Sequence, residues 1–272
     1  MKRPIAPLRQ EKANLQRLAF SCLALTLASR AATMPNFALH HLLIGVLALA
    51  AGFPAQAQPP PQQKARTMTV HAELSYLTFL PKTYSAKGTP VPLIVFLHGS
   101  GERGNDLDKV KTWGPPALAD KDPDFPFMVV SPQVPSGEWW HANLLKAMLD
   151  EVLARYNVDR SRVYLTGISM GGYGAWDLAM NYPGYFAAIA PICGGGNTLR
   201  IGQLKAVPAW VFHGLKDKSV PERESASMVA ALKAAGGDVK YTVLPGAGHS
   251  DAWVYAYGEA GLFDWFLEHR KQ

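Results

Sequence analysis

Between residues 91 and 269 the chain alternates short apolar runs with longer segments whose apolar residues recur every three or four positions. Runs that are apolar at nearly every position are typical of strands buried on both faces of a parallel sheet. Such runs lie at 91–97, 127–131, 162–166, 186–192 and 209–213, and a more alternating run lies at 239–244. Helical periodicity is found at 143–156, 170–181, 222–235 and 253–269. This alternation predicts an α/β fold, a doubly wound and mostly parallel sheet, with an antiparallel edge strand within 69–80.

The segment 1–57 has a different pattern. An uncharged apolar run at 37–53 ends in Pro54-Ala55-Gln56-Ala57, and the two alanines fit the A-x-A pattern that precedes signal-peptidase cleavage. We therefore expect export to the periplasm or the medium, with cleavage before Gln58 and with Met1 or Met34 as the start. The alternative, an uncleaved anchor, has a run slightly short of the roughly 20 apolar residues that a bilayer requires. The predicted organisation is a signal segment at 1–57, a Pro/Gln-rich spacer at 58–68 and one folded domain at 69–272.

The distribution of charge argues against a nucleic-acid partner. The net charge is +6, but the segment 1–57 holds six basic side chains and one acidic one, which leaves +1 for the rest of the chain. Nucleic-acid binding requires a concentrated basic surface. The basic balance therefore belongs to the targeting segment, and no stable membrane span is expected after its removal.

A G-x-S-x-G sequence, Gly167-Ile168-Ser169-Met170-Gly171, follows the predicted strand at 162–166 and opens the predicted helix at 170–181. A serine on such a sharp strand-to-helix turn is exposed at the carboxyl edge of the sheet. The flanking glycines leave room for the strained turn. The alternative is a glycine-rich turn with a bystander serine, but the expected partners of a nucleophile are also present.

A serine nucleophile needs a histidine base, which is oriented by a carboxylate, in the chain order Ser, acid, His for this architecture. Asp217 follows the strand at 209–213, and His249 follows the strand at 239–244 in a glycine-rich loop. The predicted triad is Ser169, Asp217 and His249. The alternatives for the acid and the base are less well placed: Asp251, Asp238, a buried structural His213, and the surface groups Asp264 and His269.

The loop after the first parallel strand reads His98-Gly99-Ser100-Gly101-Glu102-Arg103-Gly104. In this architecture that loop and the residue after the nucleophile each supply one backbone N–H to an oxyanion hole. The predicted donors are Ser100 and Met170, with Gly101 as the alternative to Ser100. We expect His98 to anchor the loop, and Glu102 and Arg103 to pair with each other or to fix the loop.

The segments HGSGERG, GISMGGYGAW, HGLKDKSVP and GAGHSDAW together resemble the α/β-hydrolase fold superfamily. Within it the chain resembles the small secreted bacterial esterases grouped as predicted peptidases, phospholipase/carboxylesterases or dienelactone-hydrolase-like enzymes. The resemblance runs from about residue 76 to 266 and is more specific for fold than for substrate. In dienelactone hydrolases proper the nucleophile is a cysteine, so the serine at position 169 does not imply their chemistry.

The region around the predicted site indicates an open pocket. Lipases and many esterases of the superfamily carry a cap, whereas only 193–207 separates the relevant strands here, so no cap domain is expected. Tryptophans after strand ends or after the base are candidates for an aromatic wall around an acyl or aryl group: Trp113, Trp139, Trp140 and Trp253. Cys193 is expected to be a buried, inert thiol. No metal-ligand spacing or phosphate-cradling loop is present, and no cofactor is expected.

These features favour a serine carboxylic-ester hydrolase that acts through an acyl-enzyme on small-molecule or polymeric esters, short-chain or aryl. A peptidase or amidase with the same triad is the main alternative, and a non-catalytic binding protein would show a broken triad. An acyltransferase remains open, as do the natural ester and the oligomeric state.

Overall fold

The computed structural model describes residues 66–69 and 71–271 of the chain. The predicted signal segment (1–57) and most of the predicted spacer (58–68) lie outside the described residues and stay predictions. The chain divides after Met68, and Thr69–Gln272 form one compact unit. None of the helices in the described ranges is both long enough and apolar enough to cross a membrane.

Seven strands form one sheet in the order β1-β3-β2-β4-β5-β6-β7. Their bounds are β1 Ser75–Phe79, β2 Val91–Leu97, β3 Met128–Gln133, β4 Val158–Ile168, β5 Ala188–Ile192, β6 Ala209–Gly214 and β7 Val239–Leu244. β1 pairs with β3 antiparallel, and every other pairing is parallel. The predicted fold class is confirmed, and each predicted run overlaps a strand.

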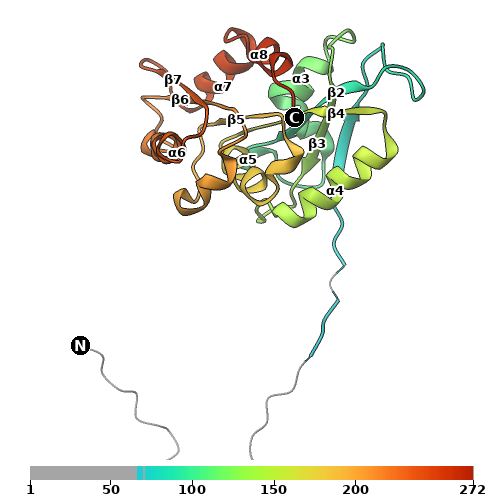
Figure 1. Ribbon diagram of the computed structural model, residues 1–272, viewed down its shortest axis with the longest axis horizontal. Helices are drawn as coiled ribbons and strands as arrows, with labels where there is room; N and C mark the ends of the chain where they lie inside the picture. The colour runs from blue at the N-terminus through green and yellow to red at the C-terminus, as the bar shows by residue number, and fades with distance from the viewer. Residues whose placement is uncertain (1–65, 70, 272) are drawn as a thin grey trace, which may run out of the picture. The chain divides into compact units, whose positions relative to one another are not determined.

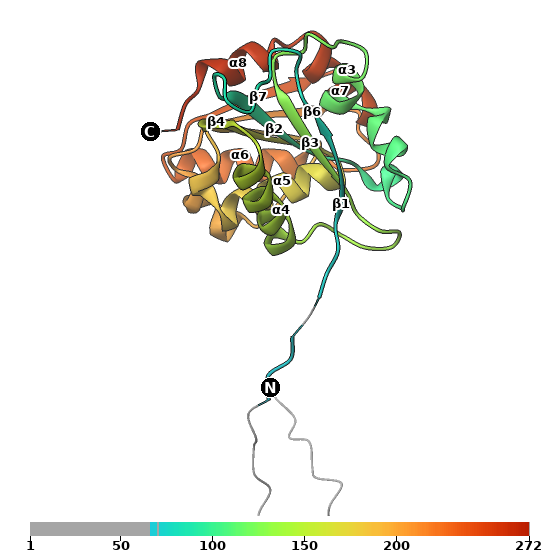
Figure 2. The ribbon, with the colours of Figure 1, turned by 90° about the vertical axis from the view of Figure 1, so that its right-hand side faces the viewer.

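Helices cover both faces of this sheet (Figures 1 and 2). One face carries α4 (Ala142–Arg155), α5 (Met170–Asn181) and α6 (Arg223–Ala234), and the other carries α3 (Gly114–Ala119), α7 (His249–Gly258) and α8 (Leu262–Glu268). Each face has its own buried apolar cluster, the first containing Trp176 and Leu149 and the second Phe212 and Phe266. β2, β3, β5 and β6 are buried throughout, which is why their sequences are almost continuously apolar, whereas the edge strands β1 and β7 are only partly buried.

Two parts of the helix prediction are wrong. The segment 253–269 is not one helix: α7 ends at Gly258, and α8 begins after Gly261, whose φ of 73° lies in the left-handed region that favours glycine. α3 was not predicted at all. Pro115 and Pro116 occupy the first turn of this helix, where the missing N–H groups have no helical partner to lose.

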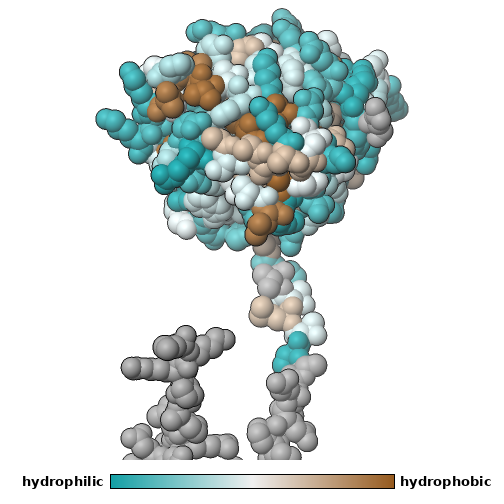
Figure 3. All heavy atoms as spheres, turned by 60° about the vertical axis from the view of Figure 1, so that its left-hand side comes forward, coloured by the Kyte–Doolittle hydropathy of each residue, from teal (hydrophilic) through white to brown (hydrophobic). Residues whose placement is uncertain are grey.

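The topology brings the loops after β2, β4, β6 and β7 to one edge, since parallel strands all end on the same side of a sheet. The connection from β5 to β6 holds only the 3₁₀ helix η4 (Thr198–Leu204), so no cap domain stands over this edge in the described chain. On the face drawn in Figure 3, hydrophobic side chains form small separate patches among hydrophilic ones.

Candidate active site

Ser169 lies at the turn between β4 and α5, with φ 55° and ψ −117°. A non-glycine residue in such a conformation costs of order 1–3 kcal/mol and persists only where its surroundings enforce it. Here the Ser169 N–H donates to the carbonyl of Ile192 at 2.9 Å, and the Ser169 carbonyl accepts from the N–H of Tyr173 at 3.1 Å. β5 and the first turn of α5 thus fix the strained backbone from two sides.

The two glycines of the motif are required by contacts between main-chain atoms. A Cβ on Gly167 would lie 2.2 Å from the carbonyl oxygen of Gly171, and a Cβ on Gly171 would lie 1.9 Å from that of Leu97. Neither neighbour is a flexible side chain that could move away. The nucleophile turn therefore packs directly on the end of β2.

We expect Gly171→Ala to lower the free energy of unfolding by about 3 kcal/mol or more, because the strand end must shift to admit the methyl group. Gly184→Ala is the matched control, since a Cβ there meets nothing within 4 Å, and it should change stability by less than about 1 kcal/mol. Urea unfolding of both variants measures the difference. Equal midpoints for Gly171→Ala and the wild type would contradict this packing.

The structure brings the three predicted triad side chains into one hydrogen-bonded chain. His249 Nε2 lies 2.9 Å from Ser169 Oγ, and His249 Nδ1 lies 2.5 Å from Asp217 Oδ2. The Asp217 side chain is fully buried, while that of His249 is 21% exposed. His249 itself is the first residue of α7, one position beyond the loop in which it was expected.

Asp217 is held as a carboxylate by three donors. Burial alone would raise its pKa, but the N–H of Val220, the His249 ring and the N–H of Ser219 outweigh burial and hold the pKa below its ordinary value. The two N–H groups donate to Oδ1 at 2.9 and 2.8 Å, which leaves Oδ2 for His249. This arrangement keeps an acceptor facing the imidazole at neutral pH.

The alternative acid, Asp251, has another task. Its carboxylate accepts the N–H of Gly248 at 2.7 Å and so caps the first turn of α7. It therefore stabilises the start of the helix that presents His249. Asp238 precedes β7, at the opposite edge of the sheet from Ser169.

The loop after β2 is anchored by two buried side chains. His98 accepts the N–H of Val134 at Nε2 (3.1 Å), its Nδ1 faces the Gly99 carbonyl, and burial lowers its pKa to about 4, so the ring is neutral. Gln133 donates to the carbonyls of Glu102 and Asp106 at 2.8 and 2.7 Å. The sequence analysis missed Gln133, although a glutamine at the end of the apolar run FMVVSPQ was an available signal.

The predicted oxyanion donors both open helices. Ser100 is the first residue of the 3₁₀ helix η1 (Ser100–Glu102), and Met170 is the first residue of α5. The first N–H groups of a helix have no partner within that helix. Ser100, the alternative donor Gly101 and Ser169 line the same crevice of about 140 Å³, so the choice between Ser100 and Gly101 stays a prediction.

Glu102 and Arg103 fix the surroundings of this crevice separately. Glu102 lines the crevice, and burial raises its pKa. The Arg103 guanidinium instead contacts Met170 Sδ at 2.9 Å and lies 5.6 Å from the centre of the Trp139 ring. Within the described residues the two side chains form no ion pair with each other.

The four candidate tryptophans occupy different places. Trp113 and Trp253 line the crevice and pack edge to face, with their ring centres 5.9 Å apart. The ring centre of Trp253 also lies 4.9 Å from that of His249. Trp140 is 5% exposed and packs on His98 at 4.7 Å. Trp139 is 49% exposed and packs against Tyr173 of α5. Trp113 and Trp253 are thus the two that adjoin the nucleophile.

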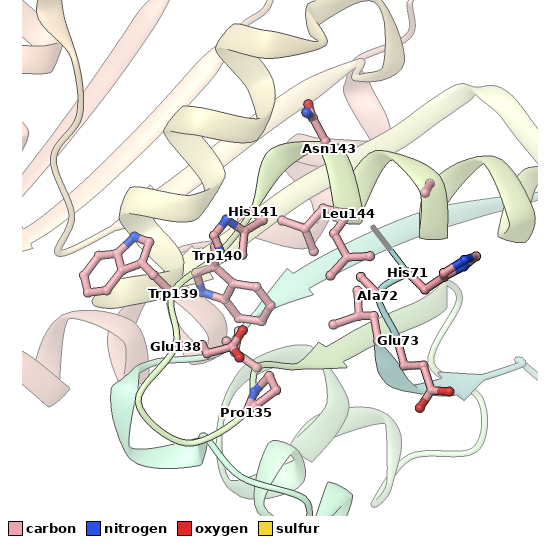
Figure 4. Close-up of a pocket in the computed structure, with 14 residues that line it drawn as sticks. His71, Ala72, Glu73, Pro135, Glu138, Trp139, Trp140, His141, Asn143 and Leu144 are labelled. Carbon is pink, nitrogen blue, oxygen red and sulfur yellow. The ribbon is translucent and has the colours of Figure 1, made fainter. Parts of the chain in front are cut away.

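A larger groove of about 900 Å³ lies between the start of α4 and the extended segment at 71–74, and Ser169 does not line it. Figure 4 shows Trp140 and Leu144 at its centre, while Trp139 points away toward α5. This larger groove is therefore separate from the crevice that contains the nucleophile.

Behind the triad, Cys193, His213 and Asp217 each place a possible metal-ligand atom within 4.8 Å of the others. Spacing in the sequence gave no sign of this cluster, since β5 and β6 bring its members together. His213 has hydrogen-bond partners at both ring nitrogens, and Asp217 at both oxygens. These groups are already committed to hydrogen bonds.

Cys193 is fully buried, as expected, and burial raises the pKa of its thiol. Because the thiolate is the reactive form, we expect no alkylation of Cys193 by iodoacetamide at pH 7.5 in the folded protein, and complete alkylation in guanidinium. Mass spectrometry of the peptide that contains Cys193 measures both. Equal modification rates in the two conditions would contradict the buried, inert thiol.

A mostly parallel sheet with a strained serine between strand and helix, and an acid and a histidine on later loops, defines the α/β-hydrolase class. Residues 61–252 match the model of the dienelactone hydrolase family. The chain belongs to that family and is a hydrolase.

Several of the similar proteins are named as esterases or depolymerases. The chain is 33% identical over 121 residues to poly(3-hydroxyalkanoate) depolymerase C of Paucimonas lemoignei (38% of this chain, 28% of that protein). It is 31% identical over 134 residues to a bifunctional acetylxylan esterase/xylanase of Neocallimastix patriciarum (46% and 19%). Both matches span less than a third of the relative. A solved thermostable esterase is 32% identical with a TM-score of 0.65, over 74% of this chain and 60% of that one.

Proposed function

We propose that the protein is a serine carboxylic-ester hydrolase that works through an acyl-enzyme. The observation that carries the proposal is the continuous hydrogen-bonded chain from Ser169 Oγ through His249 to Asp217, built on the strained turn. A neutral serine hydroxyl is a weak nucleophile, and such a chain is the arrangement that activates it.

In the first half-reaction Ser169 Oγ attacks the ester carbonyl while His249 Nε2 takes its proton. The new C–O bond forms as the carbonyl π electrons move to oxygen, and the N–H groups of Ser100 and Met170 stabilise that oxyanion, with about 3–4 kcal/mol for each donor. When the tetrahedral intermediate collapses, the alkoxide leaves and receives the proton from His249. The acyl group is then esterified to Ser169.

In the second half-reaction His249 Nε2 takes a proton from water, and the oxygen attacks the acyl carbonyl. The second intermediate collapses with cleavage of the bond to Ser169 Oγ, which recovers its proton from His249. Asp217 stays ionised throughout and keeps the proton of the neutral ring on Nδ1, so that Nε2 is free to accept.

The crevice favours a small acyl group or a flat ring. Its volume of about 140 Å³ is below the roughly 300–1,000 Å³ of pockets that enclose drug-sized ligands. Trp113 and Trp253 offer aromatic surface beside Ser169. Relatives named for acetylxylan and feruloyl esters are in line with short-chain or aryl esters on a larger alcohol.

We also propose that the protein is exported. The apolar run at 37–53 and the Ala-x-Ala sequence at 55–57 support this. The expected substrates then lie in the periplasm or the medium.

The test is hydrolysis of p-nitrophenyl acetate, butyrate and octanoate, followed by labelling with diethyl p-nitrophenyl phosphate. We expect kcat/KM for acetate and butyrate to exceed that for octanoate about tenfold or more, and one diethyl phosphoryl group on the peptide that contains Ser169. Rates no higher than buffer on all three esters, with hydrolysis of a p-nitroanilide instead, would replace the esterase with an amidase.

A further inference from the structure

The sequence assigned His213 to the core, and it is indeed fully buried at the end of β6. Its ring nevertheless touches the machinery proposed above: Nε2 lies 3.3 Å from Asp217 Oδ2, the same oxygen that faces His249. The His213 ring thus lies directly beside the carboxylate that orients His249.

One contact places a hydrogen on the ring nitrogen Nε2. His213 Nε2 lies 2.9 Å from the carbonyl oxygen of Val220. A carbonyl oxygen only accepts hydrogen bonds, so Nε2 carries a hydrogen. That N–H donates to Val220 O, and the same nitrogen lies 3.3 Å from Asp217 Oδ2, so the partial positive charge of the N–H group lies beside the carboxylate.

The other side of the ring is held by α6. His213 Nδ1 lies 2.8 Å from Ser225 Oγ, and this hydroxyl lies 2.8 Å from the carbonyl oxygen of Gly194. Ser225 is fully buried. The rotation of the imidazole is therefore fixed at Nε2 by the loop that carries Asp217 and at Nδ1 by α6.

The same contacts also close the loop that carries Asp217. His213 stands at its start and Val220 at its end, so the Nε2–H bond ties one end to the other, while Asp217 Oδ1 accepts from Val220 N–H. Across this loop, Gly214 allows the carbonyls of Ala247 and Gly248 to approach within 2.5 and 2.3 Å of where a Cβ would lie. His213 thus lies where both catalytic loops meet.

We infer that His213 is a positioning residue of the triad, which holds the loop 214–220 in register through its bond to Val220 and places its Nε2–H beside Asp217 Oδ2. The inference rests on the proposed serine hydrolase function. His213 touches neither substrate nor nucleophile, and its effect reaches Ser169 through the orientation of Asp217 and His249. The titratable groups packed around His213 are the Asp217 carboxylate and the Cys193 thiol, and His249 is linked to it by way of Asp217.

The test compares His213→Leu, which has no donor, with His213→Gln, whose Nε2 reaches about as far along the side chain. With p-nitrophenyl acetate, we expect His213→Leu to lower kcat about tenfold or more with KM changed less than twofold. His213→Gln should recover most of the loss. The acidic limb of the kcat/KM profile should move to higher pH in His213→Leu, because loss of the adjacent N–H leaves more of the Asp217 charge to stabilise the protonated His249.

A purely structural role predicts a different result. If the urea midpoint falls equally in both variants, kcat of the folded fraction stays at the wild-type value and the acidic limb does not move, the inference is wrong. If His213→Leu does not fold, Ser225→Ala provides a milder test. Its kcat should drop two- to fivefold, and the acidic limb of its kcat/KM profile should shift to higher pH as well. An unchanged kcat together with an unchanged acidic limb would overturn the inference. Wild-type hydrolysis no faster than Ser169→Ala would instead refute the hydrolase function itself.

Discussion

Ser169→Ala should lower kcat on p-nitrophenyl acetate by about 10⁶-fold, with the protein still folded, since the nucleophile acts together with its base as one unit. The reason is chemical: without Oγ no acyl-enzyme forms, and water attached to His249 has no fixed position against the carbonyl. Removing the hydroxyl leaves the backbone bonds from Ser169 to Ile192 and Tyr173 unchanged. Initial rates and a thermal unfolding curve measure the two expectations.

His249→Ala should show a loss of similar size, and the double variant should be no worse than either single one, because groups that act as a unit are strongly non-additive. Ser227→Ala is the matched control: this exposed hydroxyl on α6 donates to the Arg223 carbonyl at 2.7 Å, away from the crevice. It should retain full activity. Additive losses in the double variant would show that the serine and the histidine act in different steps.

Asp217→Asn should lower kcat by about 10⁴-fold at neutral pH with little change in KM. An amide can present its NH₂ to His249 Nδ1, which then becomes the acceptor, so the ring proton moves to Nε2 and the base no longer faces Ser169 Oγ. The side chains keep their positions, but the proton of the His249 ring lies on Nε2 instead of Nδ1. Part of the activity should return at high pH, and a pH–rate profile measures this.

Asp251→Asn is the control for the acid. Asparagine keeps an oxygen that can accept the N–H of Gly248, as Asp251 does at 2.7 Å, so α7 should start as before. Its kcat should stay within about threefold of the wild type. If Asp251→Asn lost as much activity as Asp217→Asn, the carboxylate next to His249 in sequence would have to replace Asp217 in the mechanism.

Much of the fold follows from local pattern. A strand between two helical layers has no polar face, so 91–97 was located at its observed bounds. The partly exposed edge strand at 239–244 was located equally well by its more alternating pattern. The G-x-S-x-G sequence likewise placed the start of α5 at Met170. The break at Gly261 and the short α3 depend on one glycine and on two prolines, and such residues fit a loop equally well until tertiary packing decides.

The candidate site was predictable where chain order and loop position constrain it. Ser169, Asp217 and His249 each follow a strand that ends at one edge, and a parallel sheet brings those ends together. Roles that depend on side-chain direction were not predictable. Trp139 and Trp140 are adjacent in sequence, yet one is half exposed and the other is buried against His98. The contact of His213 with Asp217 depends on the path of a loop, which no periodicity encodes.

The glycines around the nucleophile bear on how this site persists as sequences diverge. Gly167, Gly171 and Gly214 each bring main chain against main chain at distances that exclude a side chain. The positions of Ser169 and of the two catalytic loops are consequently set by peptide groups, which every sequence shares. Substitutions elsewhere in the core change side-chain volumes without entering these contacts. Distant homologues are therefore free to exchange most of their interior and their pocket walls, and thus to acquire new substrates, while the reacting atoms keep their places.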